Sequence, residues 1–458
     1  MIKNLGRRQF MGTLSGAAAG VGLASAARPG GSPILAGTVE EKPALLGGKP
    51  LRTKPFPGWP VIEDNERRGM REALDSGHWN RGPLVRRFER EWGRMLDVRY
   101  AIATSSGTAA LYTCLHALDV GPGDEVIVPP YTFVASINVV LLHHALPVFV
   151  DTDRRTFQID AQKIESAVTE NTRCIMPVHL GGNMADLDTI LAIGSRRGIP
   201  ILEDACQSHL GEWRGRKSGT LGDLGCFSFQ ASKNLNSGEG GVITTGNPDL
   251  AALCASFHNA GRPYRATDDG DLVTGDAVGF SYARNGDNRR LTEFQGAMLL
   301  EQLSRLEEQT RRREANAKYL TSQLKEVPGI APAEEYEGCT LNGYHLYMFR
   351  YDPEGFAGLP RSRFLEALEA EGVPCGGGYD PLNREPFLKH TMESRGFQRI
   401  YGERRIREWN ERNQCPENDR LCREAVWLFQ TQLLADRGDM DEIAAAVRKV
   451  RKHASELA

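Results

Sequence analysis

Residues 225–241 of the chain read GCFSFQASKNLNSGEGG, and the interpretation of the whole sequence starts from this stretch. It begins with a short apolar strand, Cys226 to Phe229, reaches Lys233 among small residues, and ends in glycines that let the chain turn. The apolar residues 242–245 follow at once, so Lys233 lies between two expected buried strands. A lysine in such a place is either half of a structural ion pair or a desolvated amine that acts as a nucleophile or Schiff-base partner. The stretch alone leaves both alternatives open.

The composition is that of a large globular protein and excludes several functional classes. The chain has 458 residues, of which 40% are hydrophobic, enough for the cores of two domains. The formal net charge is −3 with both signs interspersed, so we expect no nucleic-acid partner. The nine cysteines contain no Cys-x-x-Cys pair, which indicates unpaired thiols in a protein that folds in a reducing compartment. No apolar run is long enough to span a bilayer, and His143-His144 has no third ligand at useful spacing, so we expect no membrane span and no metal.

The first forty residues resemble a twin-arginine export signal. Arg7 and Arg8 precede a mildly apolar run at 11–27, small residues at 24–26 suit a cleavage site, and 29–33 form a spacer. Signals of this class carry folded proteins, so the sequence predicts folding in the cytoplasm followed by export to the periplasm. The alternative is a leader that is not used, on a protein that stays in the cytoplasm.

From residue 100 onward, short apolar segments alternate with helical patterns. We expect strands at 100–103, 125–129, 147–150, 173–178 and 199–202, and helices at 109–118, 136–144, 159–168 and 184–197. This alternation predicts an α/β fold, with a mainly parallel sheet covered by helices on both faces. Ligands of such sheets bind beyond the carboxyl ends of the strands. The segments expected there are 104–108, 130–133, 179–182, 204–207 and Lys233.

The predicted domain organisation has three parts. After the leader, 1–40, a large domain at 41–325 ends in a long helix from about Thr292 to Leu324, whose Arg311-Arg312-Arg313 run is expected on the solvated face. The long polar segment 261–288 is expected to be a functional loop or a partner contact. A smaller α+β domain, 326–458, follows, with strands expected at 344–351 and 373–375 and helices at 361–371 and 440–452.

The side chains at the expected strand ends match the needs of pyridoxal phosphate. Lys233 could supply the amine, and Asp204 could hold the protonated pyridine nitrogen. The turn Ser105 to Thr108 precedes a helix and could cup the phosphate with backbone N–H groups, although many α/β turns look like this without a ligand. Phe133 could stack on the ring.

Six motifs, in the same order, resemble the DegT/DnrJ/EryC1/StrS family of sugar and aminocyclitol aminotransferases, which are fold-type-I pyridoxal-phosphate enzymes. The motifs are SSGTAAL at 105–111, VPPYTF at 128–133, EDACQ at 203–207, FSF at 227–229 with Lys233, GEGG at 238–241 and NRRLTE at 288–293. The resemblance runs from about Ala44 to the end of the long helix and more loosely to the C-terminus. It implies an aspartate-aminotransferase-like fold.

The resemblance also implies a role for each matching residue. Lys233 would bond to the cofactor and move protons, and Asp204 would pair with the pyridine nitrogen. The other implied cofactor contacts are Gly107 and Thr108 through backbone N–H groups, Ser228 through its hydroxyl, Phe133 by stacking, and Gln207 near the ring hydroxyl. Asn288 would reach the phosphate of a neighbouring subunit, so the resemblance implies a homodimer with shared active sites.

The implied activity is transfer of an amino group from glutamate or glutamine to a keto sugar or a keto-cyclitol. The keto sugar would be nucleotide-linked, as in the biosynthesis of amino sugars for polysaccharides. Two alternatives stay open: a regulatory protein that binds pyridoxal phosphate without turnover, and a sugar dehydratase on the same scaffold. Members that dehydrate carry histidine in place of the lysine, so Lys233 favours transamination. Nucleotide sugars are cytosolic, which conflicts with the predicted export.

A few further residues could contact substrate, and the chain departs from the family pattern at two places. Tyr379, in a glycine-rich turn, is the best candidate and Arg262 the next, although a structural role is favoured over substrate contact for both, as it is for Tyr264 and His345. The family's tyrosine-glycine pair after the histidine is replaced in His179-Leu180-Gly181-Gly182, which predicts a roomier loop, and Cys206 in place of alanine is expected to be silent.

Overall fold

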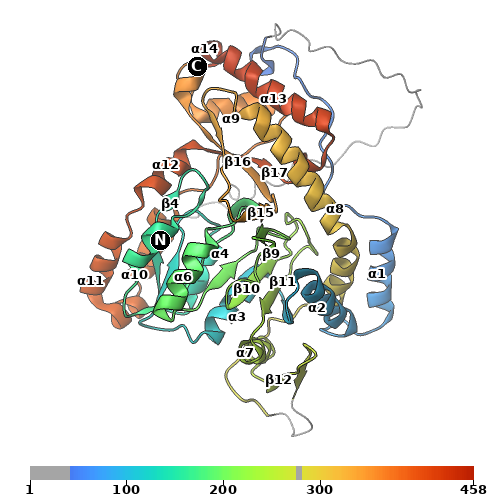
Figure 1. Ribbon diagram of the computed structural model, residues 1–458, viewed down its shortest axis with the longest axis vertical. Helices are drawn as coiled ribbons and strands as arrows, with labels where there is room; N and C mark the ends of the chain where they lie inside the picture. Colours follow the sequence, from blue (N-terminus) through green and yellow to red (C-terminus); the bar gives the residue numbers. More distant parts are fainter. Residues whose placement is uncertain (1–41, 275–280) are drawn as a thin grey trace, which may run out of the picture. The chain divides into compact units, whose positions relative to one another are not determined.

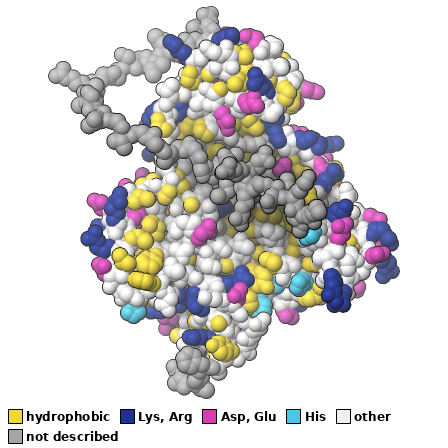
Figure 2. Space-filling model, turned by 180° about the vertical axis from the view of Figure 1, so that it is seen from behind, with side chains coloured by type: hydrophobic (Ala, Val, Ile, Leu, Met, Phe, Trp, Pro, Cys, Tyr) yellow, Lys and Arg dark blue, Asp and Glu magenta, His cyan; other side chains and the backbone are white. Residues whose placement is uncertain are grey.

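The computed structural model describes residues 42–274 and 281–458. These residues belong to one compact unit, Glu41–Ala458, and the predicted division of this unit near residue 325 stays a prediction. The predicted export signal at 1–40 lies outside the described residues. Within the described ranges, no helix combines the length and the apolar character needed to cross a membrane. Figure 2 shows Lys, Arg, Asp and Glu side chains interspersed over the visible face, in agreement with the mixed charge of the sequence.

A mixed sheet forms the centre of the unit (Figure 1). One part has the strand order β1-β11-β10-β7, and the other has the order β3-β2-β6. Parallel bridges from Ile175 to Ile201 and from Val178 to Asp204 join the two parts between β6 and β7. The strands are β1 Tyr100–Thr104, β2 Glu125–Val128, β3 Leu146–Phe149, β6 Thr172–Ile175, β7 Leu202–Asp204, β10 Leu224–Ser228 and β11 Gly241–Thr245.

The expected mainly parallel sheet is confirmed, with one reversed strand. β2 runs parallel to β3 and β6, and β10 runs parallel to β7, whereas β11 is antiparallel to both β1 and β10. The reversal follows from the turn after Lys233, where Gly238 and Gly240 have φ values of 84° and 151° that side chains would oppose. The turn therefore returns the chain directly to the sheet.

Helices cover both faces of this sheet, and single strands divide their side chains between the two sides. Along β1, Ile102 packs into one core, while Ala101 and Ala103 pack into another. The core that contains Ile102 includes residues of α3 Gly107–Ala117, α4 Ala135–Leu142 and α7 Pro248–His258. The opposite core includes residues of α2 Pro83–Leu96 and α8 Glu293–Leu324, while α6 Leu187–Arg197 covers the β6 side.

The long helix α8 connects this sheet to a second, antiparallel sheet (Figure 1). It begins at a capping box formed by Thr292 and Gln295 and has 32 residues, about 48 Å at 1.5 Å per residue. The second sheet has the order β14-β16-β17, with β14 Ile330–Pro332, β16 Leu346–Tyr351 and β17 Ala425–Phe429. Residues of α9 Arg361–Ala370 and α13 Arg437–Lys452 complete its core.

Several local expectations were wrong. Residues 373–375 form no strand, although the backbone of Gly376 pairs with Trp427. The helix expected at 159–168 is reduced to a 3-10 turn and the short α5 Ile164–Ala167. The helices α10 Pro386–Met392, α11 Arg395–Arg412 and α12 Pro416–Glu424 were not predicted. Further elements are α1 Asp64–Asp75, β4 Thr152–Asp153, β5 Gln158–Ile159, β8 Glu212–Trp213, β9 Arg216–Lys217, β12 Tyr264–Ala266, β13 Leu272–Thr274, β15 Cys339–Leu341 and α14 Ala454–Leu457.

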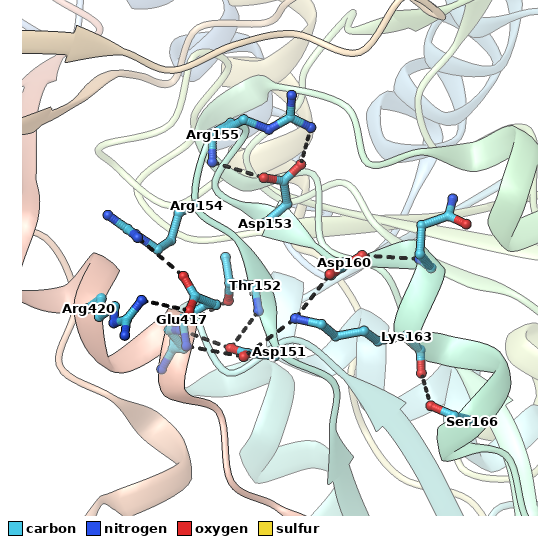
Figure 3. Close-up of polar contacts among 12 residues, drawn as sticks. Asp151, Thr152, Asp153, Arg154, Arg155, Asp160, Lys163, Ser166, Glu417 and Arg420 are labelled. Atoms are coloured by element: carbon cyan, nitrogen blue, oxygen red, sulfur yellow. Dashed lines mark hydrogen bonds and ion pairs between the residues drawn. The ribbon is translucent and has the colours of Figure 1, made fainter.

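A polar contact fixes α12 to the chain after β3 (Figure 3). The carboxylate of Asp151 accepts hydrogen bonds from the backbone N–H groups of Glu417, at 3.1 Å, and Asn418, at 2.9 Å. A carboxylate at the N-terminus of a helix also complements the helix dipole. Arg154 pairs with the Glu417 side chain at 3.2 Å. Because α12 leads directly into β17, this contact fixes the approach of β17 to the site described below.

Candidate active site

Three of the elements that carry predicted cofactor contacts meet at Gly107, the first residue of α3. A Cβ atom built on Gly107 would lie 2.7 Å from Cβ of Ser228, at the end of β10, and 2.9 Å from Sγ of Cys206, after β7. A side chain at 107 would therefore push these elements apart. Ser106 caps α3, because its hydroxyl accepts a 3.0 Å hydrogen bond from the N–H of Ala109. The free N–H groups of this helix end, with the half-buried Thr108 in the first turn, suit a phosphate.

Asp204 ends β7 as a buried carboxylate that is oriented by neutral groups. Its Oδ2 accepts a 2.8 Å hydrogen bond from the hydroxyl of Ser136, and its Oδ1 accepts a 3.2 Å bond from the N–H of Cys206. Asp204 has no salt bridge in the part of the chain that the structure describes. A buried carboxylate that lacks a cation suits a pyridinium N–H, which would supply the missing positive charge.

Phe133 belongs to the same neighbourhood and is unusually exposed. The hydroxyl of Thr132, the preceding residue, lies 3.0 Å from Oγ of Ser136, which itself bonds Asp204. The side chain of Phe133 is nevertheless 56% exposed. An exposed apolar ring one residue away from this chain of hydrogen bonds suits stacking on a flat cofactor.

Lys233 lies in the turn after β10. Its backbone N–H donates a 2.8 Å hydrogen bond to the carbonyl of Gln230. The residue is half-buried, and burial lowers the pKa of Lys233, while the nearby Cys206 and Asp204 partly oppose this shift. A lowered pKa increases the fraction of neutral amine, the form that acts as a nucleophile or base. Among residues 42–274 and 281–458, no carboxylate lies within salt-bridge distance of Lys233, so the structural ion-pair alternative lacks a partner there.

Gln207 joins two loops at the site. Its side-chain oxygen accepts a 2.9 Å hydrogen bond from the N–H of Gly181, and its amide nitrogen donates a 3.1 Å bond to the hydroxyl of Tyr379. The Tyr379 ring lies 4.6 Å from the ring of Trp427 and 5.6 Å from that of Tyr131, measured between centroids. Burial raises the pKa of Tyr379 to about 12, so its hydroxyl stays protonated. The structure therefore places Tyr379 beside a predicted cofactor contact.

The predicted extra room in the loop at 179–182 is absent. A Cβ atom on Gly181 would lie 2.6 Å from the terminal carbon of Met348, and one on Gly182 would lie 2.3 Å from the backbone nitrogen of Tyr344. The Met348 side chain and the backbone at Tyr344 therefore fill the space that the replaced tyrosine-glycine pair of the family would leave. The glycines let these segments approach closely.

Asn288 lies in a backbone ladder, and Arg262 directly follows the other segment of this ladder. The segments 259–261 and 283–288 pair through Ala260 N–H to the carbonyl of Asp287 at 2.9 Å and through a bridge between Asn259 and Asn288. Both Asn288 and Arg262 are exposed. This ladder adjoins the end of β1, where the N–H of Ser105 donates to the carbonyl of Arg289 at 2.8 Å. The role of Asn288 toward a neighbouring subunit stays a prediction.

Two histidines are buried near Lys233. His209 was not predicted from the sequence, which favoured a structural role for His345. Nε2 of His209 lies 2.9 Å from the carbonyl oxygen of Ser228. Nδ1 of His345 lies 3.3 Å from the side-chain oxygen of Asn234, the residue after Lys233. Burial, followed by the charge of Lys233, lowers the pKa of His209 to about 3 and that of His345 well below its usual value. Both imidazoles are therefore neutral near pH 7. The sequence offered one signal for His345, namely that its partner Asn234 directly follows Lys233.

The residues present fit pyridoxal phosphate. Among the described residues no cation pairs with the buried carboxylate of Asp204, the ring of Phe133 is largely exposed, and the α3 N-terminus points its N–H groups toward the end of β10 at Ser228. Lys233 supplies an amine with a lowered pKa. These are the four kinds of group that the cofactor requires.

Comparison with known proteins agrees with this chemistry. The family described as "DegT/DnrJ/EryC1/StrS aminotransferase family" matches residues 60–448. The L-glutamine:2-deoxy-scyllo-inosose aminotransferase of Streptoalloteichus tenebrarius is 38% identical over 427 residues, which cover 90% of this chain and 98% of the relative.

Solved structures are similar over most of the chain. The crystal structure of 3-amino-5-hydroxybenzoic acid synthase is 31% identical with a TM-score of 0.77, and covers 88% of this chain and 100% of that chain. S. venezuelae DesV, solved in complex with a ketimine intermediate, is 28% identical with a TM-score of 0.72, and covers 88% of this chain and 99% of that chain. The chain therefore belongs to the DegT/DnrJ/EryC1/StrS aminotransferase family, and it is a pyridoxal-phosphate-dependent transaminase of the fold-type-I class.

Proposed function

We propose that this enzyme transfers the α-amino group of L-glutamine to a keto-cyclitol. The observation that carries the substrate assignment is the 38% identity, over nearly the full length of both chains, to an L-glutamine:2-deoxy-scyllo-inosose aminotransferase. The half-buried aromatic rings of Tyr379 and Trp427 support it, because they provide apolar surface for a carbocycle beside the polar edge of Gln207. A nucleotide-linked keto sugar is the second acceptor class to be tested.

The residues of the site have separate roles in the reaction. When bound, pyridoxal phosphate stabilises the negative charge that develops on a substrate carbon as its proton leaves. Asp204, oriented by Ser136, would hold the pyridine nitrogen, and Phe133 would cover one ring face. Lys233 Nζ would remove the proton from the α-carbon of the donor and, in the second half-reaction, return a proton to the acceptor carbon, for which its lowered pKa suits it.

The two half-reactions can be followed separately. Purified enzyme loaded with pyridoxal phosphate and mixed with L-glutamine should convert its absorption spectrum to that of the pyridoxamine form within single turnovers. Addition of 2-deoxy-scyllo-inosose should reverse the change and yield an aminocyclitol. An unchanged spectrum with every amino donor would support the regulatory alternative, and loss of a sugar hydroxyl without net amino transfer would support the dehydratase alternative.

We also propose a homodimer that shares its active sites, supported by the exposed position of Asn288. Lys233→Ala and Asn288→Ala variants, each inactive alone, should regain activity when mixed and refolded together, because hybrid dimers then contain one intact site. A monomer in light scattering would contradict the dimer.

Export to the periplasm is the remaining proposal, and it rests on the sequence Arg7-Arg8. Replacement of both arginines by lysine should retain the protein in the cytoplasmic fraction. An unchanged distribution would contradict export and would leave the cytoplasm as the site of action.

A further inference from the structure

A single arginine holds three backbone segments together beside Tyr379. Nη1 of Arg361, the first residue of α9, donates hydrogen bonds to the carbonyl oxygens of Gly377 at 2.8 Å, Cys422 at 2.7 Å and Ala425 at 2.9 Å. Gly377 precedes Tyr379 by two residues, Cys422 lies in the last turn of α12, and Ala425 begins β17. Because this nitrogen carries only two N–H groups, at least one of them is shared between two carbonyls. The three segments therefore meet at one donor atom.

The positive charge of Arg361 is not matched by a carboxylate. Among residues 42–274 and 281–458, no carboxylate lies within salt-bridge distance of its guanidinium. Its position in the first turn of α9 also opposes the helix dipole, which disfavours a cation there. The last carbonyls of α12, by contrast, carry partial negative charge and lack partners within their helix. The carbonyl contacts, rather than a partner charge, therefore account for an arginine at this position.

Capping of α12 explains only part of this arrangement. The carbonyls of Cys422 and Ala425 lie at the end of α12 and the start of β17, so a donor to these two alone would have a structural role. The bond to the carbonyl of Gly377 extends the same guanidinium to the turn at 376–379, which carries Tyr379. A cap for α12 does not need this third contact.

The turn that carries Tyr379 packs closely against β17 and against the loop before α4. The backbones of Gly376 and Trp427 exchange hydrogen bonds of 2.9 and 2.8 Å. Gly378 has a φ of 84°, and a Cβ atom built on it would lie 2.6 Å from the hydroxyl oxygen of Tyr131. The place of this turn therefore determines where the side chain of Tyr379 begins.

Tyr379 connects this turn to Gln207, a predicted cofactor contact. Its hydroxyl accepts a 3.1 Å hydrogen bond from the side-chain amide of Gln207, whose oxygen accepts a 2.9 Å bond from the N–H of Gly181. Hydrogen bonds and two residues of chain therefore connect Arg361 on α9 to the site.

We propose that Arg361 is a positioning residue for the half-reaction with the acceptor. It acts without touching substrate or cofactor, because it holds the turn at 376–379 against α12 and β17 and so places the side chain of Tyr379 beside Gln207. The proposal rests on the proposed keto-cyclitol aminotransferase function and adds the group that sets the geometry of the acceptor site.

The first test removes the donors of Arg361 and compares the two half-reactions. In Arg361→Met, kcat/KM for 2-deoxy-scyllo-inosose should fall about tenfold or more, as expected for loss of charged hydrogen bonds, while the L-glutamine half-reaction stays within about twofold of the wild type. Arg363→Met is the matched control on α9, because Arg363 is 39% exposed and bonds Glu366 and the carbonyl of Leu457 instead. It should change neither half-reaction. An equal loss in both half-reactions of Arg361→Met, or a loss in neither, would overturn the proposal.

A double-mutant cycle shows whether Arg361 acts through Tyr379. If it does, Tyr379→Ala already removes what Arg361 positions, so the addition of Arg361→Met should lower kcat/KM for the acceptor by less than about twofold more. A purely structural cap of α12 would give losses that add, and additive losses would overturn the proposal. If Arg361→Met fails to fold, Arg361→Lys takes its place in the cycle, because it keeps a cation whose nitrogen ends one atom short of the carbonyls.

The place of Tyr379 can also be followed without turnover. With 3-fluorotyrosine incorporated at position 379 of the cofactor-loaded enzyme, the wild type and Arg363→Met should share one fluorine resonance. This resonance should be shifted or broadened in Arg361→Met and Arg361→Lys, and an unchanged resonance in both would overturn the positioning role. Absence of any reaction of the wild type with the keto-cyclitol would instead contradict the proposed function, and the fluorine spectra would still test Arg361.

Discussion

The hydroxyl of Ser136 donates a 2.8 Å hydrogen bond to Oδ2 of Asp204, and this bond ties the first turn of α4 to the end of β7. The same hydroxyl lies 3.0 Å from that of Thr132, the residue before Phe133. One side chain thus couples the buried carboxylate to the loop that carries the stacking ring. The resemblance that located Asp204 and Phe133 gave no role to Ser136, which becomes visible only when the two segments pack together.

Removal of this hydroxyl should weaken cofactor binding. In Ser136→Ala, the Asp204 carboxylate loses an oriented donor, and a hydrogen bond to a charged group contributes about 1.5–3 kcal/mol. We expect the Kd for pyridoxal phosphate, measured by absorbance titration of the apoenzyme, to rise roughly tenfold or more. Ser322→Ala, at an exposed hydroxyl that bonds the carbonyl of Tyr319, is the control. Equal Kd values for the two variants would contradict the role of Ser136.

A methyl group at Gly107 should disrupt the meeting point of three elements. Its Cβ would lie 2.7 Å from that of Ser228, so α3 or β10 must shift, and overpacking of this kind costs about 1–3 kcal/mol. We expect Gly107→Ala to lower the free energy of unfolding in urea and to weaken cofactor binding. In Gly121→Ala, no atom of the described residues lies within 4 Å of the added carbon, so this control should change neither quantity. Wild-type stability and binding in Gly107→Ala would show that the close approach is not needed.

Tyr379 should contribute mainly to the half-reaction with the keto-cyclitol acceptor. Tyr379→Phe removes the hydroxyl that accepts the hydrogen bond from Gln207, leaving a buried amide N–H without its partner. A loss of about 1 kcal/mol corresponds to roughly a fivefold decrease in kcat/KM for the keto-cyclitol, with the glutamine half-reaction less affected. The matched control is Tyr319→Phe, whose hydroxyl bonds Asp441 on α13. A change confined to the glutamine half-reaction would reassign Tyr379 to donor binding.

Glu203 should contribute to stability in a pH-dependent way. Burial raises the pKa of Glu203, but the hydrogen bond and charge of His179 and the N–H groups of Gly222 and Gly219 outweigh burial, so the pKa lies below its ordinary value of 4.5. Because the folded pKa is depressed, the ionised carboxylate stabilises the fold above pH 4.5, and this stability is lost as the pH falls through the folded pKa.

The variant Glu203→Gln should therefore be less stable near pH 7, by about 3–5 kcal/mol for a broken buried pair. Its free energy of unfolding should also fall less steeply below pH 4.5 than that of the wild type. Glu307→Gln, at an exposed carboxylate paired with Arg311, is the control and should retain the wild-type acid dependence. If the free energy of unfolding fell equally steeply below pH 4.5 in the wild type and in Glu203→Gln, the assignment to Glu203 would be wrong.

The sheet and the cofactor-binding strand ends could be predicted because their signals are local. The strands β1, β2, β3, β10 and β11 are short apolar runs bounded by turn residues, and each is buried. Asp204 is the last residue of a short buried strand and Lys233 lies in the turn after β10, so their positions at one sheet edge follow from the topology. The long helix α8 was predicted to within one residue for the same reason, since its periodicity is sustained.

The parts that were missed depend on contacts between distant segments. The helix α11 contains few apolar residues, and its burial comes from Phe397, Tyr401 and Trp409 alone. Arg313 looks like a surface charge until Gln430, 117 residues away in sequence, is placed against it. The space beside Gly181 is filled by Met348 from the second sheet, so the loop sequence alone gave the wrong expectation. Such contacts leave no local periodicity from which to predict them.

The central claim is tested most directly by tracing the transferred nitrogen. Wild-type enzyme should be incubated with L-glutamine labelled with nitrogen-15 at the α-amino position and with 2-deoxy-scyllo-inosose, and the product analysed by mass spectrometry. The account predicts a labelled aminocyclitol from the wild type and none from Lys233→Ala. An unlabelled product, or an equal yield of labelled product from Lys233→Ala, would contradict it.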